Sequence, residues 1–213
     1  MSEEIRNEEA KKLTDIIDKA EELDKLEEMI KNNVIYFSCD GIEYRVRKPN
    51  YAERQELREV KIKKHAELRN NSIWKYEVEL IKELKTKGID ILDMQMEIAR
   101  IQEKIEELQL KLAEFGDQKE ADNGIIVELK MQIYNLLVEQ RAIALKKIEY
   151  LSESIEAELL SLVNSYTCYL GLEKKEAENW VKVFKNYEEF MDSENENLLN
   201  LVAHYMSLII YNK

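Results

Sequence analysis

The sequence predicts a mainly α-helical protein, in which a long antiparallel coiled-coil hairpin joins a small β-hairpin plus two-helix module and a helical C-terminal end. The 213 residues include only five Gly and one Pro, too few for the turns of a sandwich, a barrel or a βαβ sheet. Long stretches repeat apolar residues at steps of three and four, which is the period of a helix face. One short stretch alternates with period two instead, which indicates strands.

These patterns divide the chain into four predicted segments. We expect an amphipathic N-terminal helix over residues 1–33, a β-hairpin and two-helix module over 34–89, a coiled-coil hairpin over 90–166 and a C-terminal helical segment over 167–213. In the first segment the apolar residues from Leu13 to Ile30 recur at three- and four-residue steps, with Glu27 interrupting the series. This spacing indicates a helix with one narrow apolar face.

The β-hairpin is predicted from alternation over residues 34–48. Asp40-Gly41 divides this stretch and suits a two-residue turn in which both central residues need positive φ. The turn sets the register and pairs Cys39 with Ile42, Phe37 with Tyr44, and Ile35 with Val46. These six residues then share one face of the hairpin. Because an isolated hairpin is marginally stable in water, that face needs a helix against it.

Two helices are predicted to follow the hairpin. The first starts at Tyr51, because Asn50 can cap it and Glu53 can bond back to Asn50 as in a capping box. A break is expected at Asn70-Asn71-Ser72, and a second helix over residues 73–87. The apolar stripe of this second helix makes it the expected cover of the hairpin.

The most regular helical pattern follows from residue 91. It predicts a coiled-coil seam made of Ile91, Met94, Ile98, Ile101, Ile105, Leu108, Leu112 and Phe115. The polar stretch 116–124 predicts the tip of a helical hairpin. A second long helix is expected to begin near Ile125, with Leu137 and Ile148 among its apolar positions. The seam closes either within one chain or between protomers, so a homo-oligomer is one of two alternatives.

The C-terminal segment is richer in aromatic residues and less regular. Gly171 interrupts the long helix, and two shorter helices are expected over about 173–190 and 194–211. The inward face of the last helix is predicted to consist of Leu198, Leu201, Val202, Tyr205, Met206 and Ile209.

Charge limits the classes of partner. The formal net charge of −12 disfavours nucleic acid, because binding to phosphates requires an excess of Lys and Arg. Residues 45–87 depart from this average, with thirteen Lys and Arg against seven Asp and Glu. A nucleic-acid-associated coiled-coil factor that uses this basic region is therefore the alternative function. Since no stretch resembles a signal peptide or a membrane span, we expect a cytoplasmic protein without membrane contact.

Motifs typical of enzymes are missing from the sequence. It contains no glycine-rich phosphate loop and no HExxH, GxSxG or EF-hand pattern. We interpret His65 as a residue on a helix surface and His204 as a packing residue. The two cysteines, Cys39 and Cys168, form no CxxC pair. We therefore expect no catalytic residue, no metal site, no cofactor and no enzymatic activity.

Protein contact is the function that these patterns favour. The predicted partner-binding residues are Tyr36, Arg45, Arg47, Lys48 and Trp74. Either Val34–Ser38 or Ile42–Arg47 would be an open strand edge that pairs with another chain, and the three cations would meet an acidic partner. For Trp74 the alternative is core packing. The expected function is that of a non-enzymatic structural or assembly protein.

A resemblance suggests a setting for this function. About a quarter of the chain carries it, in the segment FSCDGIEYRVRKPNYAERQELREVKIKKHAELRNNSIWKYEVELIKELKTKGIDI, with YRVRKPNYAERQEL and KGIDI as its main motifs. This segment resembles small modules of tailed-bacteriophage structural and tail-assembly proteins. The resemblance implies a chaperone or scaffold that contacts other virion or tail proteins, in the host cytoplasm or the virion. The long coiled coil departs from a compact chaperone and leaves open a structural role within the particle.

Overall fold

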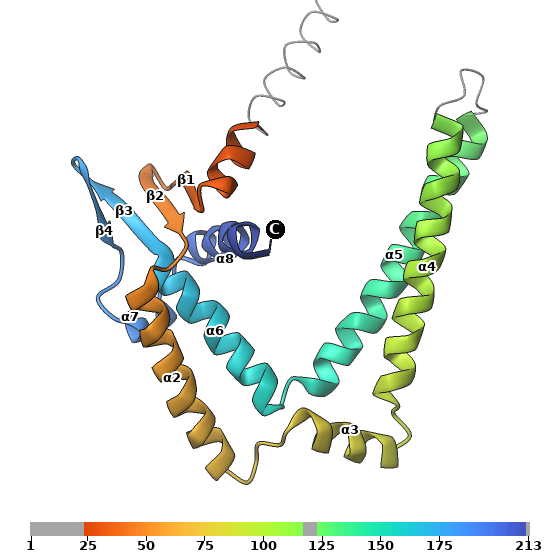
Figure 1. The fold of residues 1–213 in the computed structure, drawn as a ribbon, viewed down its shortest axis with the longest axis horizontal. Helices are drawn as coiled ribbons and strands as arrows, with labels where there is room; N and C mark the ends of the chain where they lie inside the picture. The colour runs from red at the N-terminus through yellow and green to blue at the C-terminus, as the bar shows by residue number, and fades with distance from the viewer. Residues whose placement is uncertain (1–23, 117–122, 212–213) are drawn as a thin grey trace, which may run out of the picture. The chain divides into compact units, whose positions relative to one another are not determined.

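The computed structural model describes residues 24–116 and 123–211 (Figure 1). These residues are mainly helical and include a four-stranded antiparallel sheet. They divide into two compact units. The sheet unit contains the residues up to Lys63 and those from Ser161 onward, and the helical unit is Lys64–Leu160.

The sheet has the strand order β1-β2-β3-β4. The strands are β1 (Val34–Cys39), β2 (Ile42–Arg47), β3 (Leu172–Glu176) and β4 (Asn179–Lys182). The first hairpin has the predicted register, with Cys39 opposite Ile42, Phe37 opposite Tyr44 and Ile35 opposite Val46. Asp40 and Gly41 adopt φ values of 51° and 77°, as the two-residue turn requires. Ile42 was predicted to share the apolar face, but its side chain is 44% exposed because the residue adjoins the turn.

The second hairpin, β3-β4, corrects the prediction of an all-helical segment over 167–213. The first half of the helix expected over 173–190 is extended, and only α7 (Tyr187–Met191) is helical there. The Lys and Glu residues of this stretch favour a helix locally. Pairing with β2 outweighs that preference, because it places Leu172 opposite Val46 and leaves it 1% exposed.

One face of the sheet carries the core of the sheet unit. Helix α8 (Glu196–Tyr211) packs against β1 and β2 and buries Leu198, Val202, Met206 and Ile209, four of the predicted inward residues. The other two, Leu201 and Tyr205, are partly buried against the same core. The expected cover of the hairpin, a helix over 73–87, is wrong, since that stretch contains α3 (Glu77–Thr86) of the helical unit.

Helix α2 (Tyr51–Asn70) begins as predicted. The Asn50 side-chain oxygen accepts the Glu53 N–H at 3.0 Å, and the Glu53 carboxylate accepts the Asn50 N–H at 2.8 Å. Helix α3 begins at Glu77, later than expected. The backbone before α3 makes a different hydrogen bond, because the Lys75 carbonyl accepts the Ile155 N–H at 2.9 Å.

Two long helices, α4 (Ile91–Gly116) and α5 (Asn123–Leu151), lie side by side in the helical unit (Figure 1). Their direction is antiparallel, because the Gln140 amide donates to Gln102 at 3.0 Å while Lys147 reaches back to Gln95. Of the predicted seam, Ile91, Ile101 and Ile105 are buried, and Met94, Ile98, Leu108 and Leu112 are half-buried. The Phe115 side chain lies outside the described residues.

The second long helix is shorter than predicted. It stops at Leu151, and α6 (Ile155–Gly171) begins after a break. The Ser154 hydroxyl accepts the Ala157 N–H at 3.1 Å, so it caps the new helix. The pair of α4 and α5 therefore ends near residue 151, short of the boundary expected at residue 166. Leu137 and Ile148, predicted as apolar positions of this helix, are both exposed rather than packed on α4.

We predict that Ile105→Asp lowers the unfolding free energy of the helical unit by about 3 kcal/mol, because it places an unpaired charge between α4 and α5. Urea unfolding followed by circular dichroism measures this change. Leu110→Asp on the same helix is the matched control, since Leu110 is 68% exposed. Equal losses in the two variants would contradict the packing described here.

Gly171→Ala is expected to destabilise the sheet unit by about 1 to 3 kcal/mol. A Cβ at Gly171 would collide with the backbone carbonyl of Arg47 and with the end of the Met206 side chain. The Met206 side chain can rotate away, but the Arg47 carbonyl belongs to the end of β2. Thermal denaturation measures the effect, and an unchanged melting temperature would show that this close approach does not constrain the fold.

Candidate functional site

The candidate site is the outer face of the sheet, defined as the face opposite α8. Alternation along the strands turns one cross-strand row of side chains to this face, and neighbouring residues in the row are paired. The row consists of Tyr36 on β1, Arg45 on β2, Glu173 on β3 and Lys182 on β4. The site therefore combines residues from both chain stretches of the sheet unit.

Two aromatic rings and a guanidinium pack together on this face. The ring centroids of Tyr36 and Trp180 are 5.5 Å apart, and the Arg45 guanidinium lies 4.8 Å from the Trp180 ring centroid. The latter distance is that of a cation–π contact. Tyr36 is 48% exposed and Trp180 is partly exposed. Water thus reaches an aromatic surface whose geometry is fixed by Arg45.

An ion-pair network holds Arg45 in place. The Glu173 carboxylate accepts from Arg45 at 2.7 Å and from Arg47 at 2.9 Å. Arg47 also donates two hydrogen bonds to Glu53, at 2.7 and 2.8 Å, and Lys182 donates to Glu53 at 2.8 Å. Lys182 further donates to the carbonyl of Leu170. The network therefore ties β2, β3 and β4 to the start of α2.

The network shifts the pKa values of its members. Burial acts to raise the pKa of Glu53, but hydrogen bonds from Arg47, Lys182 and the Asn50 N–H hold this pKa at about 2. At Glu173 burial also acts to raise the carboxyl pKa, but hydrogen bonds from Arg47 and Arg45 lower it below its usual value. Both carboxylates are consequently charged at neutral pH, and each offsets guanidinium charge on the face.

The structure brings together three of the five predicted partner-binding residues, Tyr36, Arg45 and Arg47. Lys48 is exposed and follows β2 directly. Trp74 belongs to the helical unit, where it packs against Leu68, Ile155 and Leu159. The expectation that Arg45 and Arg47 are available for an acidic partner changes, because Glu173 already binds both.

Sequence analysis missed Glu173 and Trp180. Both lie in the stretch assigned to a helix, and their role depends on pairing with strands far away in the sequence. The alternation of Trp180 and Lys182 with Val181 is a signal for a strand. It covers only three residues, which is too short to outweigh the helical pattern. Of the two strand edges predicted as alternatives, Ile42–Arg47 is wrong, since β2 is paired on both sides. Val34–Ser38 lies in β1, which is an edge strand of the sheet, as is β4.

The sheet unit also contains a groove of about 400 Å³. It is lined by Ser161, Asn164, Ser165, Cys168, Phe190, Met191, Leu199, Asn200 and Ala203. Burial raises the pKa of the Cys168 thiol to about 11, so the thiol stays protonated at neutral pH. Cys168 is therefore a neutral thiol in the lining of this groove. Over the residues described, no group of three or more His, Cys, Asp or Glu could hold a metal, and no helix is long and apolar enough to span a membrane.

We predict that the stability of the sheet unit depends on pH through Glu53. Its folded pKa of about 2 lies below the unperturbed 4.5, so the network contributes fully above about pH 4.5 and is lost as the pH falls toward 2. Glu53→Gln should lower the unfolding free energy at pH 7 by about 1 to 3 kcal/mol. The variant should also lose less stability than the parent between pH 4.5 and 2.

Urea unfolding at a series of pH values measures both effects. The matched control is Glu59→Gln, an exposed residue of the same helix, which is expected to behave like the parent chain. A parallel pH dependence of the parent and the Glu53→Gln variant would contradict the assigned role of the ion pairs.

Comparison of the chain with protein-family models, with curated proteins and with solved structures finds no significant match. A function for the chain must therefore be argued from the composition and geometry of its surfaces. Among the surfaces described, the outer sheet face is the one where sequence-predicted contact residues meet in space.

Proposed function

We propose that this chain is a non-enzymatic structural or assembly protein that acts through protein–protein contacts, with the outer sheet face as a partner-binding surface. The observation that carries the proposal is the cluster of Tyr36, Trp180 and Arg45. Tyr, Trp and Arg are the residue types most enriched at the energetic centres of protein interfaces. Their exposure together on one rigid sheet is the main support for a binding role.

The ion-pair network supports this role by fixing the surface before binding. Glu173 holds Arg45, and Arg45 covers the Trp180 ring. A surface that is already ordered loses less side-chain entropy when a partner binds. Because the two guanidinium groups are already paired with carboxylates, the partner is expected to supply apolar or aromatic side chains rather than a cluster of acids. Its affinity should then depend weakly on salt.

The pair of α4 and α5 would serve the assembly as a spacer. We extend the proposal to a coiled-coil hairpin, because the inward residues of both helices follow steps of three and four. The resemblance of the segment that starts at Phe37 to tailed-phage modules makes a virion or tail-assembly component the proposed setting, with chaperone or scaffold as the proposed role. Host cytoplasm or virion is the corresponding location.

A nucleic-acid-associated role for residues 45–87 is the weaker alternative. Its two leading cations, Arg45 and Arg47, are bound to Glu173 and Glu53, which reduces the positive charge that phosphates would meet. Fluorescence anisotropy with labelled single- and double-stranded DNA at low salt tests this alternative. Tight, salt-sensitive binding would favour it over the protein-contact proposal.

The proposal itself is tested by selecting peptide ligands from a random displayed library against the full chain. The chain contains two tryptophans, so Trp74→Phe leaves Trp180 as the only tryptophan reporter. Selected peptides are expected to shift the Trp180 emission in this variant, because they cover its ring. Labelled peptides then give affinities by anisotropy for the site variants.

Tyr36→Ser and Trp180→Ser should each weaken peptide binding by about tenfold or more, as expected for residues at the centre of an interface. The control is Ile62→Ser on α2, which removes a comparable exposed apolar side chain, 60% exposed, away from the outer face. Peptides that bind equally well to all three variants would place the binding surface elsewhere.

A further inference from the structure

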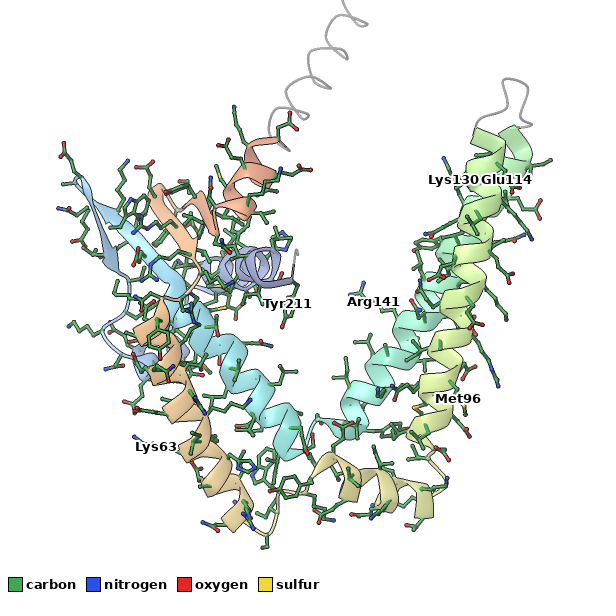
Figure 2. The ribbon with its side chains drawn as sticks, in the orientation of Figure 1. Lys63, Met96, Glu114, Lys130, Arg141 and Tyr211 are labelled. Atoms are coloured by element: carbon green, nitrogen blue, oxygen red, sulfur yellow. The ribbon has the colours of Figure 1, made fainter. Side chains whose placement is uncertain are left out.

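Helix α5 carries a second apolar stripe that faces away from α4. Its large side chains are each 45–65% exposed, and they are Val127, Met131, Tyr134, Leu137, Val138, Leu145 and Ile148. The stripe facing α4 is separate and consists of Ile126, Leu129, Ile133, Leu136, Gln140, Ile143, Lys147 and Tyr150, all partly buried. Figure 2 shows Arg141, which lies in line with the exposed stripe, pointing away from α4.

The exposed stripe has the spacing of a coiled-coil seam. Its central positions are 127, 131, 134, 138, 141, 145 and 148, which alternate steps of four and three without interruption. All are apolar except Arg141. The pattern covers about three heptads and about 32 Å of helix, which is the length at which heptads indicate coiled-coil pairing. A helix with two such seams suits a bundle with helices on both sides.

We propose that this stripe joins two copies of the chain, with α5 of one copy packed antiparallel on α5 of the other. The seam requires a partner helix with the same heptad spacing and a similar length. The exposed stripe of α5 meets both requirements itself. The charges beside the stripe balance in number, with Glu128 and Glu149 against Lys130 and Arg141, so the stripe itself adds no like-charge excess between two copies.

Charge at the seam selects the antiparallel direction. A parallel pair in register would stack Arg141 on Arg141, and this like-charge contact is destabilising. An antiparallel pair centred at the level of residue 136 places Arg141 across from Met131, within reach of Glu128 of the second copy. The same arrangement pairs Val138 with Tyr134, Leu145 with Val127, and Leu137 with Leu137. It also overlaps α5 along almost its whole length, because residue 136 is near the helix centre.

Light scattering coupled to size exclusion tests the inference on the full chain. The parent is expected at about twice 25.3 kDa, with a fraction of monomer that grows on dilution. Val138→Glu should give a monomer with unchanged helical circular dichroism, because Val138 is half exposed within one chain. Leu110→Glu, which removes an exposed leucine on α4, should remain dimeric.

Cysteine cross-linking tests the direction independently of Val138→Glu. Under mild oxidation, Leu137→Cys should form a disulfide with its copy, because the proposed axis passes beside it. Leu145→Cys should not, because it lies far from Leu145 of the second copy. The native Cys39 and Cys168 are buried and remain in both variants. A parent chain that is monomeric at high concentration, a dimer that survives Val138→Glu, or cross-linking through Leu145→Cys would each overturn the proposal.

This interface does not depend on the outer sheet face. Val138→Glu leaves Tyr36 and Trp180 untouched, so selected peptides should bind the monomeric variant as they bind the parent. The variant Tyr36→Ser should weaken peptide binding but should still form the dimer. The two proposals therefore fail or succeed separately.

Discussion

The pairing of β3 with β2 holds together the two chain stretches that form the sheet unit. Arg45 and Arg47 bind the same carboxylate, Glu173, on the outer face, while Leu172 lies opposite Val46 in the core beneath α8. A buried Glu173 without these guanidinium groups would carry an uncompensated desolvation cost. The ion pairs therefore offset the cost of burying Glu173 in the paired strand, and the same Arg45 lies over the Trp180 ring.

The sequence predicted the elements whose cause is local. The Asp40-Gly41 turn determines the register of β1 and β2, and the capping box at Asn50 determines the start of α2. The strands β3 and β4 were assigned to a helix, because the interactions that make them extended come from β2, more than a hundred residues earlier. For the same reason Tyr36 and Arg45 were identified as site residues while Trp180 was not.

Helix α5 illustrates a related limit of periodicity. Apolar residues occur on two of its faces, so a three-four pattern can be traced through either one. Leu137 and Ile148, predicted only as apolar positions of this helix, belong to the exposed face. The Gln140 contacts with Ile98 and Gln102 reveal which face meets α4. A pattern predicts that a face is apolar, but a contact is needed to say what covers it.

The shifted pKa values in the sheet unit have structural causes. Glu53 and Glu173 are charged because of Arg47, Lys182 and Arg45, and the Cys168 thiol is neutral because it is buried.

The outer sheet face and the exposed α5 stripe offer aromatic and aliphatic side chains beside balanced charges. Such surfaces gain free energy mainly by excluding water from side chains such as Trp180 and Val138. Their occupants are therefore selected by shape and periodicity more than by net charge. For α5 this criterion favours a helix of matching heptads, and for the outer face it favours a segment that packs on the rings of Tyr36 and Trp180.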